Sequence, residues 1–368
     1  MNIGIDAGAI CVNDDKLKTG VYRINLHLLE GLSKLDKKNN YLLYSFSPIN
    51  KNILKNLGPN FKNLVLTPTK GWLSLRLSLE LFLKKPDIFL GLSQALPLYY
   101  PPKSLLFVYD LAFELYPNCY SDSKKLSRQT QRAVNNANKI ITISNSTKND
   151  LTKFYNIDKK KIEVIYPGIE DFFKPQESRT ITEVKEEYGL SKPYVLFVGS
   201  LKPIKNIERI LFTFQRLPEN LLQKYQLVIT GSNYWIEKPI FYMLKKMQRK
   251  GLVRYLGFVE DNKLPALYSG AEVFLSPSLY EGFGLPLLEA ASCDCPIITS
   301  NCGSMPEVIS PAAKLVNPLN SDEILNALEE ILNNKDLRDK MGRLSLERAE
   351  KFPQETFAKK VYHIINTL

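Results

Sequence analysis

Short apolar segments that resemble β-strands alternate with helical segments from one end of this chain to the other. Their near-continuous apolar character is typical of strands in a parallel sheet that helices cover on both faces. Gly20–Leu35 is expected to form the first amphipathic helix, because apolar residues such as Val21, Ile24 and Leu28 recur in it at helical spacing. In the first half of the chain the expected strands are Asn2–Asp6, Tyr41–Phe46, Leu64–Thr67, Asp87–Leu92, Ser104–Tyr109, Ile140–Ser144 and Ile162–Tyr166.

The same alternation begins again after a stretch rich in proline and charge, 167–193. Two consecutive series predict two Rossmann-like, doubly wound α/β domains with a cleft between them, where ligands bind at the carboxyl ends of the strands. We expect an N-terminal domain at 1–175, a second at 190–351, and a last helix at about 352–368 that crosses back to the first domain. The expected strands of the second series are Tyr194–Gly199, Gln226–Thr230, Val253–Leu256, Glu272–Ser276, Pro296–Thr299 and Lys314–Val316.

Length and composition allow this organisation, since 368 residues suffice for two domains and a chain that is 44% hydrophobic and 24% charged is typical of soluble globular proteins. The chain contains no apolar run of about 18 residues, and its first residues lack the basic flank of a signal peptide. Its five cysteines, an odd number, favour a reducing compartment. We therefore expect a cytoplasmic protein, which can also lie at the inner face of the membrane.

Cys293, Cys295 and Cys302 lie close enough in sequence to raise the question of a metal site. Their spacing lacks the second ligand pair of a zinc site, and the chain has only two histidines. Small buried thiols around packed strands are the better interpretation. We expect no bound metal and no cofactor.

The formal net charge of +11 suits nucleic acid, an anionic membrane surface or phosphate-bearing substrates as partners. No nucleic-acid-binding motif accompanies the charge, so nucleic acid is not expected. The segment Gly71–Lys85 places leucines and aromatic residues beside Arg76, Lys84 and Lys85. A helix of this kind can lie on an anionic membrane surface, or it can simply pack against the N-terminal sheet.

The most informative segment, Phe274–Val308, begins with an expected strand. Its turn Glu281-Gly282-Phe283-Gly284-Leu285-Pro286 opens a helix, and proline suits the first helical position because its missing N–H costs nothing there. The two glycines let a ligand approach the backbone closely, and the free N–H groups of a helix start attract an anion. A diphosphate is the natural occupant of such a site.

Glu289 follows Glu281 by eight residues, about one turn into the expected helix, so both carboxylates can reach the same pocket. Two carboxylates beside a phosphate site are useful when they accept hydrogen bonds from hydroxyl groups, such as those of a ribose or a sugar ring. The alternative is that Glu281 caps the helix and Glu289 is a solvated surface residue. The complete string of residues favours the functional interpretation.

This segment resembles the E-x7-E motif of family 4 of the retaining glycosyltransferases, which have the two-domain fold called GT-B. The strings EGFGLPLLEA, CPIITSN and GSMPEV are also similar to that family, and the likeness extends over nearly the whole chain. The resemblance implies that Glu281 contacts the donor sugar and that Glu289 binds the nucleotide ribose. It also implies that backbone N–H groups from Gly282 to Leu285 hold the donor phosphates.

A second segment, Phe197–Asn206, lies between an expected strand and an expected helix. In the family that it resembles, a lysine at the position of Lys205 neutralises phosphate and stabilises the leaving nucleoside diphosphate. The family often has an arginine directly after the glycine, where this chain has Ser200, and Lys202 is the candidate replacement. The alternative is a solvated lysine, although a helix start is an unfavourable place for a cation.

The segment Val108–Glu114 ends a strand of the first domain and resembles the family's H-D-L-A-F sequence, with Tyr109 in place of the histidine. The resemblance implies that this position contacts the donor sugar, and tyrosine can still donate one hydrogen bond. Asp110 is a candidate for binding donor or acceptor hydroxyls. The alternative is a core tyrosine followed by a turn aspartate.

Gly20 opens the first helix after the loop Ala7–Lys18. The resemblance implies that this turn contacts donor phosphate and acceptor, and glycine permits a close approach. The simpler interpretation is an ordinary helix start capped by Thr19.

The edge of the base pocket is expected after two strands of the second domain. Gly231 follows the strand Gln226–Thr230, and Phe258 and Val259 follow a later strand. In the family, backbone around the latter pair contacts the base.

Together these features predict a retaining glycosyltransferase that moves a hexose from a nucleotide sugar, GDP-mannose in the first instance, to a hydroxyl of a glycan or lipid-linked glycan. No D-x-D pair ends a strand, so Lys205 and the helix start are expected to replace a divalent metal. The resemblance implies front-face attack in which the leaving phosphate assists deprotonation. Two alternatives are a non-catalytic subunit, which Ser200 and Tyr109 favour, and a basic nucleic-acid-binding protein.

Overall fold

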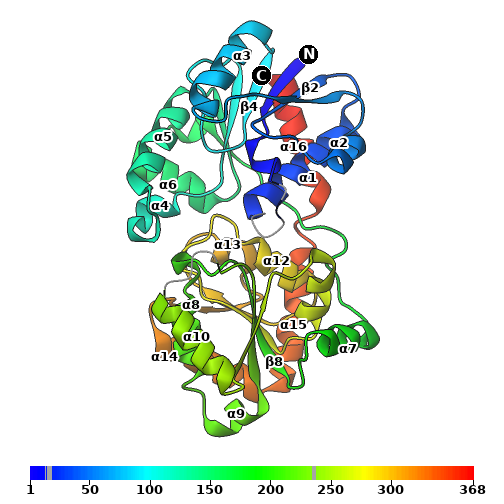
Figure 1. Cartoon of the computed structure of the whole chain (residues 1–368). Coiled ribbons are helices and arrows are strands. Elements are labelled where there is room, and N and C mark those ends of the chain that lie inside the picture. The colour runs from blue at the N-terminus through cyan, green and yellow to red at the C-terminus, as the bar shows by residue number, and fades with distance from the viewer. Residues whose placement is uncertain (13, 15–18, 234–237) are drawn as a thin grey trace. The chain divides into compact units, whose positions relative to one another are not determined.

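The computed structural model describes residues 1–12, 14, 19–233 and 238–368, and the chain divides into two compact units (Figure 1). Unit 1 comprises Met1–Gly168 together with Gln354–Leu368, and unit 2 comprises Ile169–Pro353. Each unit contains one fully parallel sheet flanked by helices, which confirms the predicted fold class.

The sheet of unit 1 has seven strands in the order β3-β2-β1-β4-β5-β6-β7. The order reverses next to β1, which is the arrangement of a doubly wound sheet. The strands are β1 (Asn2–Asp6), β2 (Asn40–Ser45), β3 (Phe61–Val65), β4 (Ile88–Gly91), β5 (Ser104–Val108), β6 (Lys139–Thr142) and β7 (Ile162–Val164).

Helices cover both faces of this sheet (Figure 1). The helices are α1 (Gly20–Leu35), α2 (Lys51–Leu57), α3 (Leu77–Lys84), α4 (Ala112–Leu115), α5 (Ser123–Asn136), α6 (Asn145–Tyr155) and α16 (Gln354–Thr367). Single helical turns are η1 (Gly8–Ile10), the π-helical η3 (Trp72–Arg76), η4 (Pro117–Cys119) and η5 (Lys159–Lys161).

The last helix of the chain, α16, packs against the first, α1, and corresponds to the helix expected at 352–368. The two helices approach closely at Gly31, where an added Cβ atom would lie 2.3 Å from the Cβ of Ala358. Beside this contact the ring of Phe357 meets that of Phe107 on β5, with centroids 6.4 Å apart. The C-terminal segment is therefore part of the core of unit 1.

We expect Gly31→Ala to lower the free energy of unfolding by about 2 kcal/mol, because the new methyl group forces the helices apart although alanine is the better helix former. The shift in the urea midpoint at unchanged slope measures this loss. Ala358→Gly removes the facing methyl group, so the double variant should be more stable than the sum of the two single losses. Strict additivity would show that this contact is not the cause.

The sheet of unit 2 has six strands in the order β10-β9-β8-β11-β12-β13. Its core is made by apolar side chains from the strands and covering helices, among them Phe197 and Phe214, which are both buried. The strands are β8 (Tyr194–Val198), β9 (Gln226–Thr230), β10 (Val253–Gly257), β11 (Val273–Ser276), β12 (Ile297–Ser300) and β13 (Lys314–Val316).

The helices of unit 2 alternate with these strands along the chain. They are α7 (Ser178–Glu187), α8 (Ile207–Phe214), α9 (Glu219–Lys224), α10 (Lys238–Arg249), α11 (Leu264–Ser269), α12 (Leu285–Ser292), α13 (Met305–Ile309), α14 (Ser321–Asn333) and α15 (Lys335–Ala349), with short turns η6 (Pro203–Lys205) and η7 (Asp261–Lys263).

The expected strands are all present, and most of their ends shift by one or two residues. The largest difference is β3, predicted at Leu64–Thr67 and found at Phe61–Val65, because the ring of Phe61 stacks on that of Tyr41 in the neighbouring strand. The stretch 167–193, read only as a connection, contains α7. This helix buries Val184 and packs against α11, so unit 2 begins earlier than the predicted 190.

The segment Gly71–Lys85 forms η3 and α3, and it satisfies part of each interpretation given for it. One face packs into unit 1, with Leu77 and Leu81 fully buried. The opposite face leaves Leu79 and Leu83 exposed at 54% and 65%. A helix that only covered the sheet would place polar residues there, so this face is available for another contact.

Candidate functional site

The predicted donor residues of unit 2 gather at the carboxyl ends of its strands. Lys205 follows β8, Gly231 follows β9, and Glu281 follows β11. Because all strands run in parallel, these ends share one edge of the sheet, which is where ligands bind in such folds.

The centre of this edge is an ion pair between Lys205 and Glu281. The Lys205 Nζ atom lies 2.6 Å from Glu281 Oε1 and 2.7 Å from Oε2, and the Ser278 hydroxyl donates to Oε1 at 2.7 Å. The two charged side chains are 22% and 14% exposed. The lysine therefore holds both carboxylate oxygens at a place that solvent and a ligand can still reach.

The backbone at Glu281 is fixed by the turn that follows β12. The carbonyl oxygen of Glu281 accepts hydrogen bonds from the Ser304 hydroxyl at 2.9 Å and from its N–H at 3.3 Å. Gly303 has a φ of +60°, and an added Cβ would lie 3.1 Å from the same carbonyl oxygen. Only glycine suits this close approach in the left-handed region, which explains the glycine of the GSMPEV string.

Lys205 is positioned by a short turn, η6, and by the residue that follows it. Asn206 has a φ of +61° and is buried, and its side-chain amide donates to the carbonyl oxygens of Pro277 at 2.9 Å and Pro318 at 2.8 Å. Asparagine tolerates this left-handed conformation better than most residues. These bonds tie the lysine loop to the loop that carries Glu281.

The start of α12 provides hydrogen-bond donors beside the ion pair. Gly284 precedes the helix with a φ of +90°, and Pro286 occupies the first turn. Within the described residues, the N–H groups of Gly284 and Leu285 donate to no acceptor. Unused donors at a helix N-terminus bind anions, so the turn from Gly282 through Phe283 to Leu285 has the chemistry predicted for a phosphate site.

Glu289 lies on α12 behind this turn and is 1% exposed. Its Oε2 atom accepts a hydrogen bond from the Tyr268 hydroxyl at 2.8 Å. The Tyr268 ring is itself packed edge-on against Phe274 of β11. Glu289 is therefore a positioned buried carboxylate and not the solvated residue that the alternative interpretation required.

The turns after β8 and β9 approach each other at Gly231. A Cβ atom at Gly231, which has a φ of +132°, would lie 2.0 Å from the carbonyl oxygen of Gly199, so no side chain fits. The Gly231 N–H donates to the Gly257 carbonyl at 2.7 Å. Ser200 and Lys202 are partly exposed in the loop just after Gly199.

Phe258 and Val259 follow Gly257 at the end of β10. The Phe258 ring is half-exposed and Val259 is buried. The phenyl ring is thus able to contact a flat ligand, and Val259 holds the loop in the core.

Tyr109 and Asp110 belong to unit 1 and lie at the end of β5. The Tyr109 ring is 3% exposed, and its hydroxyl group contacts the Asn25 side chain and the Leu92 carbonyl oxygen, the latter at 2.9 Å. Burial raises its pKa, and the nearby Asp6 charge raises it further, so the hydroxyl stays neutral. This geometry favours the core tyrosine over direct contact with a sugar.

Asp110 is partly exposed and its Oδ1 atom accepts the Ala112 N–H at 3.0 Å, as a turn aspartate does. Gly20 is the first residue of α1, and the Thr19 side chain makes no capping hydrogen bond. Part of the loop Ala7–Lys18 before it, residues 13 and 15–18, lies outside the described residues.

Asp6 is a buried acid that the motifs did not single out. It ends β1, is 1% exposed, and accepts hydrogen bonds from the Ser93 hydroxyl and, at 3.0 Å, from the Gly8 N–H. Burial raises the pKa of its carboxyl group. Its position at the carboxyl end of the first strand was the signal that could have marked it as a candidate.

The structure describes all five cysteines. All five are free thiols, and burial raises the pKa of Cys293 and Cys295, which disfavours the thiolate that a metal needs. No group of three potential ligands is close enough among the described side chains to hold a metal ion. Buried Cys293 and Cys295 therefore act as small core residues.

Comparison with known proteins gives two family matches. A family model described as glycosyl transferases group 1 matches residues 178–348, and one described as glycosyltransferase family 4 matches residues 72–171. The first match contains Lys205, Glu281 and Glu289, and the second contains Tyr109 and Asp110.

The O-antigen chain mannosyltransferase B of Escherichia coli is 30% identical over 62% of this chain, and the match spans 61% of that relative's length. Among solved structures, sucrose-phosphate synthase from Thermosynechococcus elongatus is 18% identical with a TM-score of 0.81, over 100% of this chain and 98% of its own. The HepE protein of Anabaena in complex with UDP-glucose is 16% identical with a TM-score of 0.76, over 100% and 99% of the two chains. At these identities the two structures show that the fold is shared.

Proposed function

The chain belongs to the group 1 glycosyl transferases, and from this membership we propose that it moves a hexose from a nucleotide sugar to a hydroxyl group of a glycan or lipid-linked glycan, with retention of the anomeric configuration. The observation that carries the proposal is the Lys205–Glu281 pair beside the N–H groups that open α12. The cation and the anion site suit the diphosphate of a nucleotide sugar, and the carboxylate at the same strand edge suits the hydroxyl groups of its sugar.

Each part has a role in the proposed reaction. Lys205 and the N–H groups of Gly284 and Leu285 stabilise the negative charge that develops on the leaving diphosphate. Glu281 accepts hydrogen bonds from sugar hydroxyls, and Glu289 accepts them from the ribose. The leaving phosphate takes the proton of the attacking hydroxyl, so the protein contributes mainly position and charge.

Mannose is the proposed sugar and GDP-mannose the proposed donor. The support is the relative named as an O-antigen chain mannosyltransferase, while HepE, which shares the fold, is in complex with UDP-glucose. We also propose that no divalent metal is required, because Lys205 and the start of α12 supply positive charge where a metal would lie.

The test is release of nucleotide by the purified chain from GDP-, UDP- and ADP-sugars in the presence of candidate acceptors. We expect GDP-mannose to be turned over fastest, an unchanged rate in EDTA, and an α-linked product from the α-linked donor by NMR. Glu281→Ala should lower turnover at least about a hundredfold. If no donor is bound or turned over, the transferase proposal fails.

A second proposal concerns the place where the chain meets its acceptor. None of the helices in the described residues is long and apolar enough to cross a membrane. The exposed leucines of α3 and the net charge of +11 support peripheral association with an anionic membrane, which would bring the chain to a lipid-linked acceptor.

A further inference from the structure

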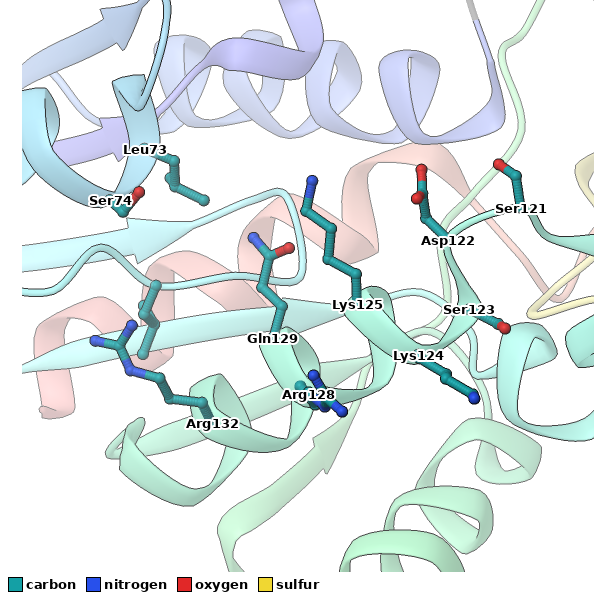
Figure 2. Close-up of a pocket in the computed structure, with 11 residues that line it drawn as sticks. Leu73, Ser74, Ser121, Asp122, Ser123, Lys124, Lys125, Arg128, Gln129 and Arg132 are labelled. Atoms are coloured by element: carbon teal, nitrogen blue, oxygen red, sulfur yellow. The ribbon is translucent and has the colours of Figure 1, made fainter.

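Unit 1 contains a pocket of about 780 Å³ that none of the predicted site residues lines. It lies between η3, which contributes Leu73 and Ser74, and the first turns of α5. Figure 2 shows Lys125 and Gln129 extending from α5 to the same side of that helix. The pocket is therefore a separate candidate site and not part of the donor site of unit 2.

The pocket is strongly basic. Lys124, Lys125, Arg128 and Arg132 line it from α5, and the only acid among its lining residues is Asp122. All four basic side chains are exposed, and within the described residues none of them forms an ion pair. Four cations against one carboxylate leave a concave surface with excess positive charge, which favours a multiply charged anion.

An apolar patch lies next to the pocket. It consists of side chains from η3, α3 and the loop before β5, which are exposed although they are large and hydrophobic. Their exposures are Leu75 65%, Leu79 54%, Phe82 54%, Leu83 65%, Leu98 53% and Tyr99 39%. Six such residues together form a larger apolar surface than isolated exposed side chains would.

Direct contacts join α3 to the loop that carries Leu98 and Tyr99. The Ser78 hydroxyl accepts the N–H groups of Leu98 at 2.8 Å and Tyr99 at 3.1 Å, and the Tyr99 ring meets Phe82 edge-on with centroids 5.3 Å apart. The apolar side chains of α3 and of the loop therefore lie side by side.

The same loop also joins the patch to the pocket. Arg132 of the pocket donates to the carbonyl oxygen of Pro97 at 3.4 Å, next to Leu98 of the patch. On the other side, Ser74 lines the pocket and Leu75 belongs to the patch. The cations and the hydrocarbon are therefore neighbours on one surface of unit 1.

We propose that this pocket binds the phosphate headgroup of an anionic phospholipid, while the apolar patch inserts between the acyl chains of the same membrane. A phosphate-bearing lipid carries negative charge and hydrocarbon in adjoining parts, as the surface requires. A soluble phosphate has no hydrocarbon to contact the apolar patch, and a neutral membrane has no negative charge to bind the basic pocket. The inference rests on the membrane association proposed above, and it assigns that association to named residues.

The test is sedimentation of the full chain with vesicles of phosphatidylcholine, with and without phosphatidylglycerol. The pocket variant is Lys125→Ser with Arg128→Ser and Arg132→Ser, and the patch variant is Leu79→Ser with Phe82→Ser. A matched control removes three exposed cations from α10, Lys245→Ser with Lys246→Ser and Arg249→Ser.

We expect the chain to bind only the vesicles that contain phosphatidylglycerol. Each lost cation should weaken binding about fivefold, so the pocket variant should bind about a hundredfold more weakly. The patch variant should also lose binding, and the control should lose at most a few-fold. Release of nucleotide from a soluble donor should be unchanged in all three, which separates this proposal from that of the donor site.

Several outcomes would overturn the inference. Equal losses for the pocket variant and the control would mean diffuse attraction of a basic protein. Binding that ignores phosphatidylglycerol but requires a polyprenyl diphosphate in the vesicle would assign the pocket to the acceptor instead. Glycerol phosphate that binds the pocket as tightly as the vesicles do would remove any role for the patch. Because the mutated side chains are exposed, every variant should unfold cooperatively near the wild-type temperature, with a small loss where Arg132 and Phe82 give up their contacts.

Discussion

Lys205→Ala is expected to lower kcat for nucleotide release about a thousandfold. The lysine is the only cation on the Glu281 carboxylate in the described structure, with Nζ to oxygen distances of 2.6 and 2.7 Å. Its loss removes positive charge from the site proposed for the diphosphate, an effect that commonly costs a hundredfold to a thousandfold in kcat. It also leaves the Glu281 charge facing the donor phosphates, so repulsion adds to the loss.

A double variant separates these two effects. If Lys205 acts only by pairing with Glu281, then adding Glu281→Gln to Lys205→Ala should recover activity, because the unpaired charge is gone. If Lys205 also stabilises the leaving group, the double variant should regain only the part lost to repulsion and stay far below Glu281→Gln alone, which is the expected result. Both are measured as kcat at saturating donor, with thermal unfolding as the check on folding.

Ser278→Ala is the matched control for this pair. Its hydroxyl donates to Glu281 Oε1 at 2.7 Å and carries no charge, so its loss should cost about tenfold or less. A Lys205→Ala variant that keeps wild-type kcat would contradict the proposed role of the lysine, whatever the control does.

The strand pattern predicted the architecture because a strand that is buried on both faces of a parallel sheet is a nearly continuous apolar run in the sequence. Gly20–Leu35 is found as α1 with the same bounds, and every expected strand exists. The helix α7 was missed because its charged residues resemble those of a connection, and only its packing on α11 shows its buried face. Boundaries set by tertiary contact, such as the Phe61–Tyr41 stack that moves β3, are not encoded in a local pattern.

The residues of the candidate site were likewise predicted only in part. Motif spacing predicted Glu281, Glu289 and the turn that opens α12, where Gly284 has a φ of +90° and Pro286 occupies the first turn. It did not predict Ser278 or Ser304, whose hydrogen bonds to Glu281 depend on loops that meet only in the folded unit. It also could not show that Tyr109 is buried, since burial of that hydroxyl depends on Asn25 and Leu92.

Glu289→Gln is expected to raise the KM for the donor about thirtyfold with a much smaller change in kcat. A hydrogen bond from a hydroxyl group to a carboxylate contributes about 2 kcal/mol to binding. Its loss corresponds to a factor of about thirty in affinity. Glutamine keeps the volume of the buried side chain, so the packing of α12 is preserved. The loss should appear in KM because the ribose is bound equally in the ground state and the transition state.

The 2′-deoxy form of the donor shows whether the ribose is the group that Glu289 recognises. The wild type should discriminate against the deoxy donor about tenfold or more. Glu289→Gln should lose that discrimination, since the carboxylate that distinguishes the two donors is gone. Tyr268→Phe is the matched control: it removes the protein's own 2.8 Å hydrogen bond to Glu289 and should lower the unfolding free energy by about 1 kcal/mol. Discrimination should survive in that control. If Glu289→Gln still discriminates like the wild type, the ribose is bound elsewhere, and the buried Glu289–Tyr268 pair serves the stability of unit 2.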